Sequence, residues 1–451
     1  MNIYRALTIA GSDSGGGAGI QADLKTFAAF GVHGMTAITA ITAQNTVDVL
    51  DIFVLPPKIV ELQIDAVASD IGVDAAKTGM LYNKEIIETV SRKIDEYNLK
   101  IIVDPVMIAK SGVKLLLDEA IRALKYSLIP KALIVTPNIS EAEVLTGLKI
   151  RNIDDMKKAA EEICDLGVEA VVIKGGHLEG KYEVIDILYY KRKFYEIRKE
   201  RVESRCTHGT GCTFSAAITA LIARGKSIPE AVEMASKFMN RAIKFGIRVG
   251  EGHGPVNPMI ELYRKSSKYE CWNRVHEALK IIENTHEISK LIPEVRMNIG
   301  EAIENAENEN DVCAIDGRIS IVNGRPRAVG CPVFGASSHV ARIILTVMKF
   351  NSKFRAAANM RYSRKIIEIC KELGYRVAFF DRGKEPEHVK KIEGASLPWG
   401  ISKAINDYGD IPDIIYDLGD VGKEPMIRVL GKNSVEVANK IRRIAKKLVK
   451  I

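Results

Sequence analysis

Residues 6–19 read ALTIAGSDSGGGAG, and this stretch sets the architecture of the first half of the chain. The apolar run Ala6–Ala10 predicts a buried strand, and the glycine-rich turn Gly11–Gly19 leads into a helix that begins near Ala18. Backbone amides of such a turn can approach a ligand closely because glycine has no side chain. The glycine spacing fits neither G-x-x-x-x-G-K-[ST] nor G-x-G-x-x-G. The stretch therefore predicts a strand, a ligand-binding turn and a helix, but not yet a ligand.

The same alternation of short apolar runs and amphipathic stretches continues to about residue 260. Further strands are predicted at Ala37–Ile41, Ala75–Thr78, Ile101–Asp104, Leu133–Thr136 and Ala170–Lys174. Helices are predicted at Lys84–Tyr97, Leu115–Leu128 and Asp154–Leu166. Ile185–Tyr190 and Phe194–Arg198 flank a polar turn and predict a hairpin. This alternation is typical of an α/β fold with a doubly wound, mostly parallel sheet.

A second, smaller α/β domain is predicted beyond a loop at Glu251–Pro258. The polar run Arg264–Glu270 predicts a linker, so we expect domains at residues 1–262 and 270–451. Helices are expected near Trp272–Lys290, Ser338–Phe350, Tyr362–Leu373 and Val435–Lys450. Apolar runs that predict strands lie at Asp311–Ile315, Arg376–Phe380 and Asp413–Tyr416.

Composition limits the classes of protein. The 451 residues are 47% hydrophobic and 27% charged, which excludes a disordered or fibrous chain. We find no apolar run long enough for a membrane helix and no secretory signal, so we expect a cytoplasmic protein. Seven widely spaced cysteines without a C-x-x-C pair predict neither a disulfide framework nor a zinc site. Residues 264–451 hold 33 Lys+Arg against 24 Asp+Glu, which favours phosphate-bearing ligands, nucleic acid or simply a solvated basic surface.

The most specific motif is Thr207-His-Gly-Thr-Gly-Cys212, which precedes a helix of small and apolar residues. Gly209, Thr210 and Gly211 at a helix N-terminus direct unpaired N–H groups and the helix dipole toward one point, as an anion hole for a phosphoryl group requires. Cys212 lies in the first turn, where we expect a lowered thiol pKa. The alternative is a helix packed through glycine around an inert cysteine.

Polar residues at three further strand ends complete a phosphotransferase site, because ligands of open α/β sheets bind beyond the carboxyl ends of strands. Asp104, Asn138 and Glu141 offer oxygen ligands for Mg²⁺ and its waters. Lys174 offers a cation for phosphate oxygens. Each alone is more often structural. Together they predict a kinase without a P-loop.

The motifs AGSDSGGGAGIQADLKT, TAQNT, KTGML, DPVM, TPNISEAE, KGGH and THGTGCT together resemble the hydroxymethylpyrimidine and phosphomethylpyrimidine kinases of thiamine biosynthesis, a ribokinase-fold family. The resemblance covers about residues 4–258 and implies ATP and Mg²⁺ as cofactors. It implies that Gln44 binds the aminopyrimidine edge, and a carboxamide does offer the matching donor and acceptor. A structural turn amide at Gln44 remains the alternative, and pyridoxal kinase is the nearest competing activity.

The remaining kinase roles follow from the same resemblance. Gly11, Asp23 and Met80 line the pyrimidine pocket, and Cys212 takes the place of the aspartate base of most ribokinase-like enzymes. Lys174 contacts phosphate, and Asn138 with Glu141 organises Mg²⁺.

In the second domain, several arginines lie around a predicted helix start at Ser337 or Ser338, which favours a second anion site. The motifs AIDGRISIV, CPVFGASSHVAR and RAAANMRY resemble the archaeal type of thiamine-phosphate synthase over roughly 270–451. The resemblance implies Arg318 and His339 as catalytic residues, with His339 donating to phosphate oxygens when protonated. It implies substrate contacts from Arg342, Arg355, Asn359 and Arg361.

Both resemblances together imply a bifunctional enzyme. The first domain phosphorylates 4-amino-5-hydroxymethyl-2-methylpyrimidine twice, and the second couples the pyrophosphate to 4-methyl-5-(2-phosphoethyl)thiazole, giving thiamine phosphate and PPi. The alternative is a kinase with a ligand-sensing or dimerisation domain. We expect small-molecule substrates, no nucleic acid, because no nucleic-acid-binding motif is visible, and no membrane. We also expect a homo-oligomer, a dimer.

Overall fold

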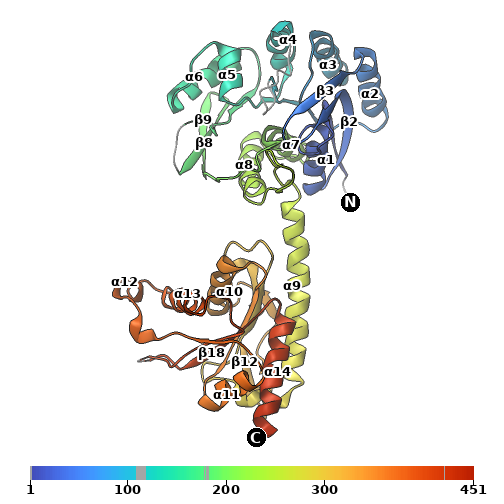
Figure 1. Ribbon diagram of the computed structural model, residues 1–451. Coiled ribbons are helices and arrows are strands. Elements are labelled where there is room, and N and C mark those ends of the chain that lie inside the picture. The colour runs from blue at the N-terminus through green and yellow to red at the C-terminus, as the bar shows by residue number, and fades with distance from the viewer. Residues whose placement is uncertain (1–2, 108–117, 177, 179–181, 421, 451) are drawn as a thin grey trace. The chain divides into compact units, whose positions relative to one another are not determined.

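A computed structural model describes residues 3–107, 118–176, 178, 182–420 and 422–450. The chain divides into two compact units, Met1–Glu261 and Leu262–Ile451, whose elements are labelled in Figure 1. Within the described ranges, no helix has the length and apolar character that a membrane crossing requires.

The first unit is built on a nine-stranded sheet with the strand order β3-β2-β1-β4-β5-β6-β7-β8-β9. The strands are β1 Tyr4–Asp13, β2 Val32–Gln44, β3 Val49–Val54, β4 Ala75–Thr78, β5 Ile101–Val103, β6 Ile134–Val135, β7 Ala170–Ile173, β8 Glu183–Tyr190 and β9 Lys193–Glu200. The six strands from β2 to β7 in this order are parallel to one another, and β3 and β8 run antiparallel to them on either side. The edge strand β9 pairs antiparallel with β8. The predicted doubly wound, mostly parallel sheet is confirmed.

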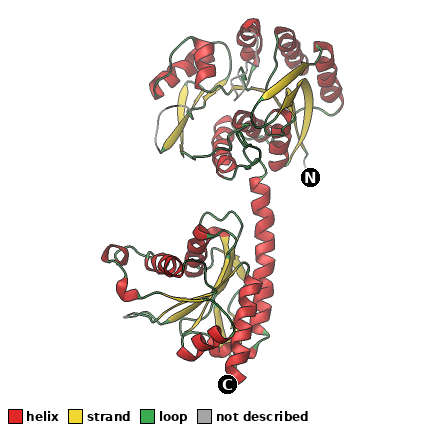
Figure 2. Cartoon of the chain, in the orientation of Figure 1, coloured by secondary structure: helices red, strands yellow, loops and turns green. Residues whose placement is uncertain are grey.

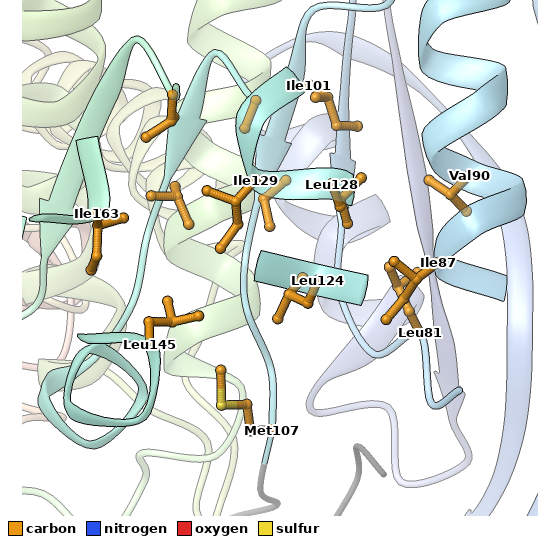
Figure 3. Packing of buried hydrophobic residues seen from close by; sticks show 14 of the residues in the cluster. Leu81, Ile87, Val90, Ile101, Met107, Leu124, Leu128, Ile129, Leu145 and Ile163 are labelled. Atoms are coloured by element: carbon orange, nitrogen blue, oxygen red, sulfur yellow. The ribbon is translucent and has the colours of Figure 1, made fainter. Parts of the chain in front are cut away.

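Helices cover both faces of this sheet, as Figure 2 shows. They are α1 Gly19–Ala29, α2 Pro57–Asp70, α3 Lys84–Tyr97, α4 Asp118–Ala123, α5 Ile139–Thr146, α6 Ile153–Cys164, α7 Thr210–Ala223 and α8 Ile228–Lys244. The helices α2, α3, α5 and α6 enclose one core, and α1, α7 and α8 enclose the other. Figure 3 shows side chains of the first core converging from α3, the π-helical turn Leu124–Leu128 and α6. Burial on both faces explains why the central strands are almost purely apolar in sequence.

The second unit has a seven-stranded sheet with the order β14-β11-β10-β15-β18-β17-β16, in which only β16 and β17 are parallel, and a two-stranded ribbon, β12 and β13. Its strands are β10 Ile299–Ala302, β11 Val312–Ile315, β12 Ile319–Val322, β13 Arg325–Ala328, β14 Pro332–Phe334, β15 Ala356–Arg361, β16 Val377–Phe379, β17 Ile414–Asp417 and β18 Met426–Gly431. After the long helix α9, Ile260–Glu283, come the helices α10 Ser338–Phe350, α11 Arg364–Glu372, α12 Glu387–Lys390, α13 Ser396–Tyr408 and α14 Ser434–Lys450. The predicted second α/β region is therefore present.

The predicted linker is wrong, because Arg264–Glu270 belongs to the long helix α9, Ile260–Glu283. Because most residues of this run are polar, its helical periodicity is not apparent from the sequence. Arg264, Cys271 and Val275 are buried at helical spacing. Arg264 is buried because its Nη2 pairs with Asp311 Oδ1 at 2.7 Å. The sequence also gave no prediction for β3, α2 and α8. The first three residues of the helix predicted at Leu115–Leu128 lie outside the described residues.

Candidate active sites

The carboxyl edge of the first sheet collects the predicted kinase residues. Lys174 directly follows β7 and forms an isolated parallel bridge with Asn138, which follows β6 and caps α5. A β-carbon added to Gly211, in the first turn of α7, would lie 3.4 Å from Lys174 Nζ and 3.5 Å from Asp104 Oδ2. The N-terminus of α7 therefore meets the cation and the carboxylate that the sequence places at separate strand ends.

The carboxylates at this edge are held by a polar network. Lys174 Nζ lies 3.3 Å from Asp104 Oδ1, and Ser215 Oγ donates to Asp104 Oδ2 at 3.2 Å. Burial raises the pKa of Glu141 to about 7; Lys174 opposes this shift and the charge of Asp104 adds to it. Asn138 and Glu141 form a capping box, in which each side chain accepts the other's backbone N–H.

The described residues contain no group of three or more His, Cys, Asp or Glu side chains that could hold a metal ion. Mg²⁺ commonly binds through one or two carboxylates and completes its octahedron with waters and substrate phosphates. The buried, mutually repelling carboxylates of Asp104 and Glu141 fit such a site, because a cation would relieve their repulsion. Asn138 fits less well, since its Oδ1 already accepts the Glu141 amide.

Cys212 lies half-buried in the first turn of α7, as predicted, but its ionisation differs from the prediction. Burial raises the pKa of Cys212 to about 12, with the positive charge of Lys77 opposing this shift and the charges of Asp23 and Asp104 adding to it. The Gly19 amide also hydrogen-bonds to the thiol and favours the thiolate. The prediction of a lowered pKa is therefore wrong, because desolvation outweighs the helix dipole.

Asp23, which the resemblance implies as a residue of the pyrimidine pocket, pairs with a buried lysine. Its carboxylate is fully buried, with Oδ1 2.7 Å from Lys77 Nζ and Oδ2 accepting from Thr8 Oγ1 at 2.7 Å. The Lys77 ammonium, equally buried, also donates to the Cys212 carbonyl at 3.5 Å. The sequence predicts no role for Lys77. A single lysine in the apolar strand β4 was the available signal, because a buried lysine requires a partner.

The two glycine-rich segments of the kinase unit pass close to each other. Gly209 has a φ of +76°, and an added β-carbon would lie 1.8 Å from the Gly17 carbonyl oxygen, so only glycine fits. An added β-carbon on Gly11 would lie 2.6 Å from Met80 Cε, which places these two expected pocket residues side by side.

Gln44, at the end of β2, lies beside His208 of the T-H-G-T-G-C motif. The Gln44 Nε2 and His208 Nε2 atoms are 3.4 Å apart, and His208 Nε2 is 2.9 Å from Asp13 Oδ2. The Asp13 carboxylate also accepts the backbone amides of residues 15, 17 and 18, which fixes the first glycine-rich turn. Asp13 and His208 lie within the two glycine-rich motifs, but the sequence predicts no site role for either.

In the second unit, His339 lies in the first turn of α10, whose cap is Ser337. Desolvation by surrounding protein atoms lowers the pKa of His339 to about 4, although the residue is exposed to solvent. The positive charges of Arg428, Arg318, Arg382 and Arg342 lower it further. His339 is therefore neutral at pH 7 in the free protein, unlike the protonated donor that we expected.

Arg318 lies in an exposed turn after β11 with a φ of +70°, and its guanidinium donates to the Val295 carbonyl. Arg342 pairs with Glu309 at 3.1 Å. These two expected residues and His339 thus lie within electrostatic reach of one another.

Arg355 and Asn359, which the resemblance implies as substrate contacts, both form hydrogen bonds within the second unit. Asn359 is buried, donates to the Arg296 carbonyl at 2.9 Å and accepts the Asn298 amide at 2.7 Å, so its amide joins β15 to the segment that precedes β10. Arg355 precedes β15 and donates to the Ala302 carbonyl, whereas Arg361 ends the same strand. Across six residues of strand these two arginines are roughly 20 Å apart.

Three charged residues that we had not predicted lie in this region. Asp417 Oδ1 accepts from Arg382 Nε at 2.7 Å, and Asp417 Oδ2 accepts from Arg428 Nη1 at 2.6 Å. Arg428 is fully buried, and its Nε has no hydrogen-bond partner within the described part of the chain. The available signal was an arginine in the otherwise apolar strand β18.

The first unit thus has the fold of a ribokinase-like phosphotransferase, and a glycine-rich helix N-terminus lies close to a lysine and a carboxylate at its sheet edge. Residues 13–257 match the phosphomethylpyrimidine kinase family, and residues 274–443 match the family of thiamine-phosphate synthase ThiN. The chain belongs to the family of bifunctional thiamine biosynthesis proteins, with a kinase domain followed by a synthase domain.

Individual relatives cover the whole chain or its first unit. The bifunctional thiamine biosynthesis protein ThiDN of Methanocaldococcus jannaschii is 34% identical over 98% of both chains. The hydroxymethylpyrimidine/phosphomethylpyrimidine kinase of Bacillus subtilis is 53% identical over 57% of this chain and 95% of its own length. The solved structure of pyridoxal kinase from Staphylococcus aureus with AMP-PCP has a TM-score of 0.54 and 41% identity, over 57% of this chain and 94% of that one.

Proposed function

We propose that the first unit phosphorylates 4-amino-5-hydroxymethyl-2-methylpyrimidine and then its monophosphate, with ATP as donor. The convergence of Gly211, Lys174 and Asp104 at one edge of the sheet carries this proposal. Amides at the N-terminus of α7 and the Lys174 ammonium stabilise the transferring phosphoryl group. Cys212 lies nearest the substrate hydroxyl, and Gln44, Gly11 and Met80 form the pyrimidine pocket.

Mg²⁺ would be held by Asp104 and Glu141 together with waters and ATP phosphates, and it would neutralise developing charge on the phosphates. Lys174 neutralises part of the same carboxylate pair from the protein side. Ser215 and Thr136 orient Asp104 by donating to its two oxygens. Asp23 and Lys77 form an ion pair without net charge, and Lys77 joins this pair to Cys212 through the Cys212 carbonyl.

We propose that the second unit couples the pyrimidine pyrophosphate to 4-methyl-5-(2-phosphoethyl)thiazole, releasing PPi and forming thiamine phosphate. Arg318, whose charge acts on His339, suits this reaction because departing pyrophosphate gains negative charge that a guanidinium fork stabilises. Neutral His339 keeps one N–H donor for a phosphate oxygen. Arg342 and Arg361 serve as further anion contacts.

The test uses the full chain and its Cys212→Ala variant. The wild type should make thiamine phosphate from hydroxymethylpyrimidine, ATP and thiazole phosphate. The variant should fail with these substrates but succeed when it is given the pyrimidine pyrophosphate directly. If neither protein couples the pyrophosphate, the second unit is a sensor or a dimerisation domain rather than a synthase.

Two further proposals rest on separate observations. Phosphorylation of pyridoxal is a candidate side activity, supported by the 41% identity to a pyridoxal kinase, and a direct assay with pyridoxal tests it.

A homodimer is supported by the exposed apolar side chains of Leu50 and Phe53 on the edge strand β3. Light scattering of the wild type and of Phe53→Asp tests it, with a dimer and a monomer as the expected results.

A further inference from the structure

A hydrogen-bonded chain of three side chains, Asp13, His208 and Gln44, joins the two glycine-rich segments of the kinase unit. His208 Nε2 is 2.9 Å from Asp13 Oδ2 and 3.4 Å from Gln44 Nε2. Only 4% of the Asp13 side chain and 15% of the His208 side chain is exposed to solvent. A buried hydrogen-bond network of this kind fixes which atoms carry protons.

The proton of His208 follows from its neighbour. Burial opposes ionisation of Asp13, but hydrogen bonds from His208 and from backbone amides hold the pKa of that carboxyl below its usual range. An ionised carboxylate can only accept hydrogen bonds. His208 Nε2 must therefore carry a proton, and its N–H donates a hydrogen bond to Asp13 Oδ2. The side-chain N–H groups of Gln44 then face another N–H group.

The other end of the Gln44 amide shows the same mismatch. Thr42 Oγ1 has a single proton, and it lies 3.0 Å from the Ser12 carbonyl and 3.3 Å from Gln44 Oε1. With its proton on Ser12, Thr42 presents lone pairs to the Gln44 oxygen. A turn of the amide by 180° removes both mismatches. Its oxygen then faces the His208 Nε2–H, which makes a bifurcated hydrogen bond with Asp13 as the nearer acceptor and Gln44 as the more distant one. Its nitrogen donates to Thr42.

We propose that His208 is a specificity-determining positioning residue, which holds the Gln44 amide with its oxygen toward the imidazole and its nitrogen toward Thr42. This inference deepens the proposed function and rests on Gln44 as the group that binds the aminopyrimidine. The amide oxygen then accepts from the 4-amino group, and the amide N–H donates to the adjacent ring nitrogen.

The orientation of the amide also orients the substrate. The 5-hydroxymethyl group is next to the 4-amino group on the ring, so it lies on the His208 side of the pocket. His208 comes four residues before Cys212, directly ahead of the N-terminus of α7. The amide orientation set by His208 therefore directs the reacting hydroxyl toward Cys212 and the anion hole, whereas the opposite orientation turns it away.

The experiment compares two substrates on the full chain: hydroxymethylpyrimidine, and its 4-oxo analogue, whose ring N–H and carbonyl reverse the donor and acceptor. The wild type should reject the analogue by about 10³-fold or more in kcat/KM, because a mismatched site leaves buried polar groups unpaired. His208→Leu frees the amide to rotate and should reduce this ratio at least about tenfold. His208→Gln, which retains an N–H near the same place, should restore it. His33→Leu, at an exposed histidine of the same unit, is the matched control and should leave the ratio unchanged.

Two further variants keep the outcome decisive. Thr42→Val removes the acceptor at the other end of the amide and should lower the ratio in the same direction, without altering His208. An unchanged ratio in folded His208→Leu, or in Thr42→Val if His208→Leu does not fold, overturns the inference. Gln44→Leu tests the underlying proposal: if it leaves the KM for hydroxymethylpyrimidine unaltered, Gln44 does not bind the pyrimidine, and the proposed function of this pocket fails instead.

Discussion

Cys212 in the first unit and His339 in the second occupy equivalent local positions, in the first turn of a helix that faces a proposed phosphate site. Both are uncharged at pH 7 in the free protein, because burial raises the pKa of the thiol and desolvation lowers that of the imidazole. Their surrounding charges differ in sign. Carboxylates oppose ionisation of Cys212, whereas four arginines oppose protonation of His339.

The two sites also obtain their positive potential from different parts of the chain. In the kinase unit, the proposed site uses backbone amides of glycine-rich segments that are each contiguous in sequence, together with the ammonium of Lys174. The second unit uses side chains of Arg318, Arg342, Arg382 and Arg428, which come from four separate elements. A helix N-terminus therefore predicts where an anion binds, but it does not predict the protonation of the residue beside it.

The largest expected effect concerns the reactivity of Cys212. With a pKa of about 12, only about 10⁻⁴ of this thiol is ionised at pH 8, so iodoacetamide should modify it about 10³-fold more slowly than an unperturbed thiol. Mass spectrometry of the native and the urea-unfolded protein measures both rates, with the exposed Cys331 as internal reference. Equal rates for Cys212 in the two states would show that its thiol is not protected.

The next effect separates the two sites by function. Arg318→Ala and His339→Ala should each reduce thiamine phosphate synthesis by at least about 10²-fold, as the loss of one charge-stabilising donor does. Kinase activity should persist, because Gly209–Cys212 belongs to the other unit. Paired assays of both reactions check this. A parallel loss of both activities indicates unfolding, and no loss of either places the synthase site elsewhere.

The third prediction concerns the contribution of the buried ion pairs of the second unit to its free energy of unfolding. Asp417→Asn leaves Arg382 and Arg428 without their shared counter-charge and should lower the free energy of unfolding by about 3 kcal/mol, as breaking a buried pair does. Asp407→Asn, which removes an exposed ion pair with Lys403 on α13, is the control and should cost under about 0.5 kcal/mol. Urea unfolding curves measure both. Similar costs would mean that the buried cluster adds no particular stability.

The smallest effect is a fraction of a proton. A bound anion favours the protonated form of His339, so pyrophosphate binding should take up less than one proton per site at pH 6, above the free pKa of about 4. Calorimetry in two buffers of different ionisation enthalpy measures this uptake, and His339→Gln corrects for protons carried by pyrophosphate itself. Equal uptake by wild type and variant would exclude His339 as the group that titrates.

The sequence predicted the first unit well where structure is local. Lys84–Tyr97 and Ala75–Thr78 have the predicted bounds, because periodicity and burial agree there. The prediction failed at β3, whose apolar side chains are exposed at a sheet edge, and at α9, whose buried arginine resembles a linker residue. In both places the polarity of a residue does not predict its burial. The edge position exposes apolar side chains of β3, and an ion pair with Asp311 allows Arg264 of α9 to be buried.

The sequence by itself determined the α/β fold and the family, because glycine-rich turns, helix starts and strand ends are encoded by neighbouring residues. It also determined which polar residues end the strands, and therefore that Lys174 and Asp104 meet. Only the tertiary structure decided that Asp23 is sequestered by Lys77, that Arg428 pairs with Asp417, and that Cys212 and His339 are uncharged. Ionisation depends on burial and on charges brought together from distant positions, and no local pattern carries that information.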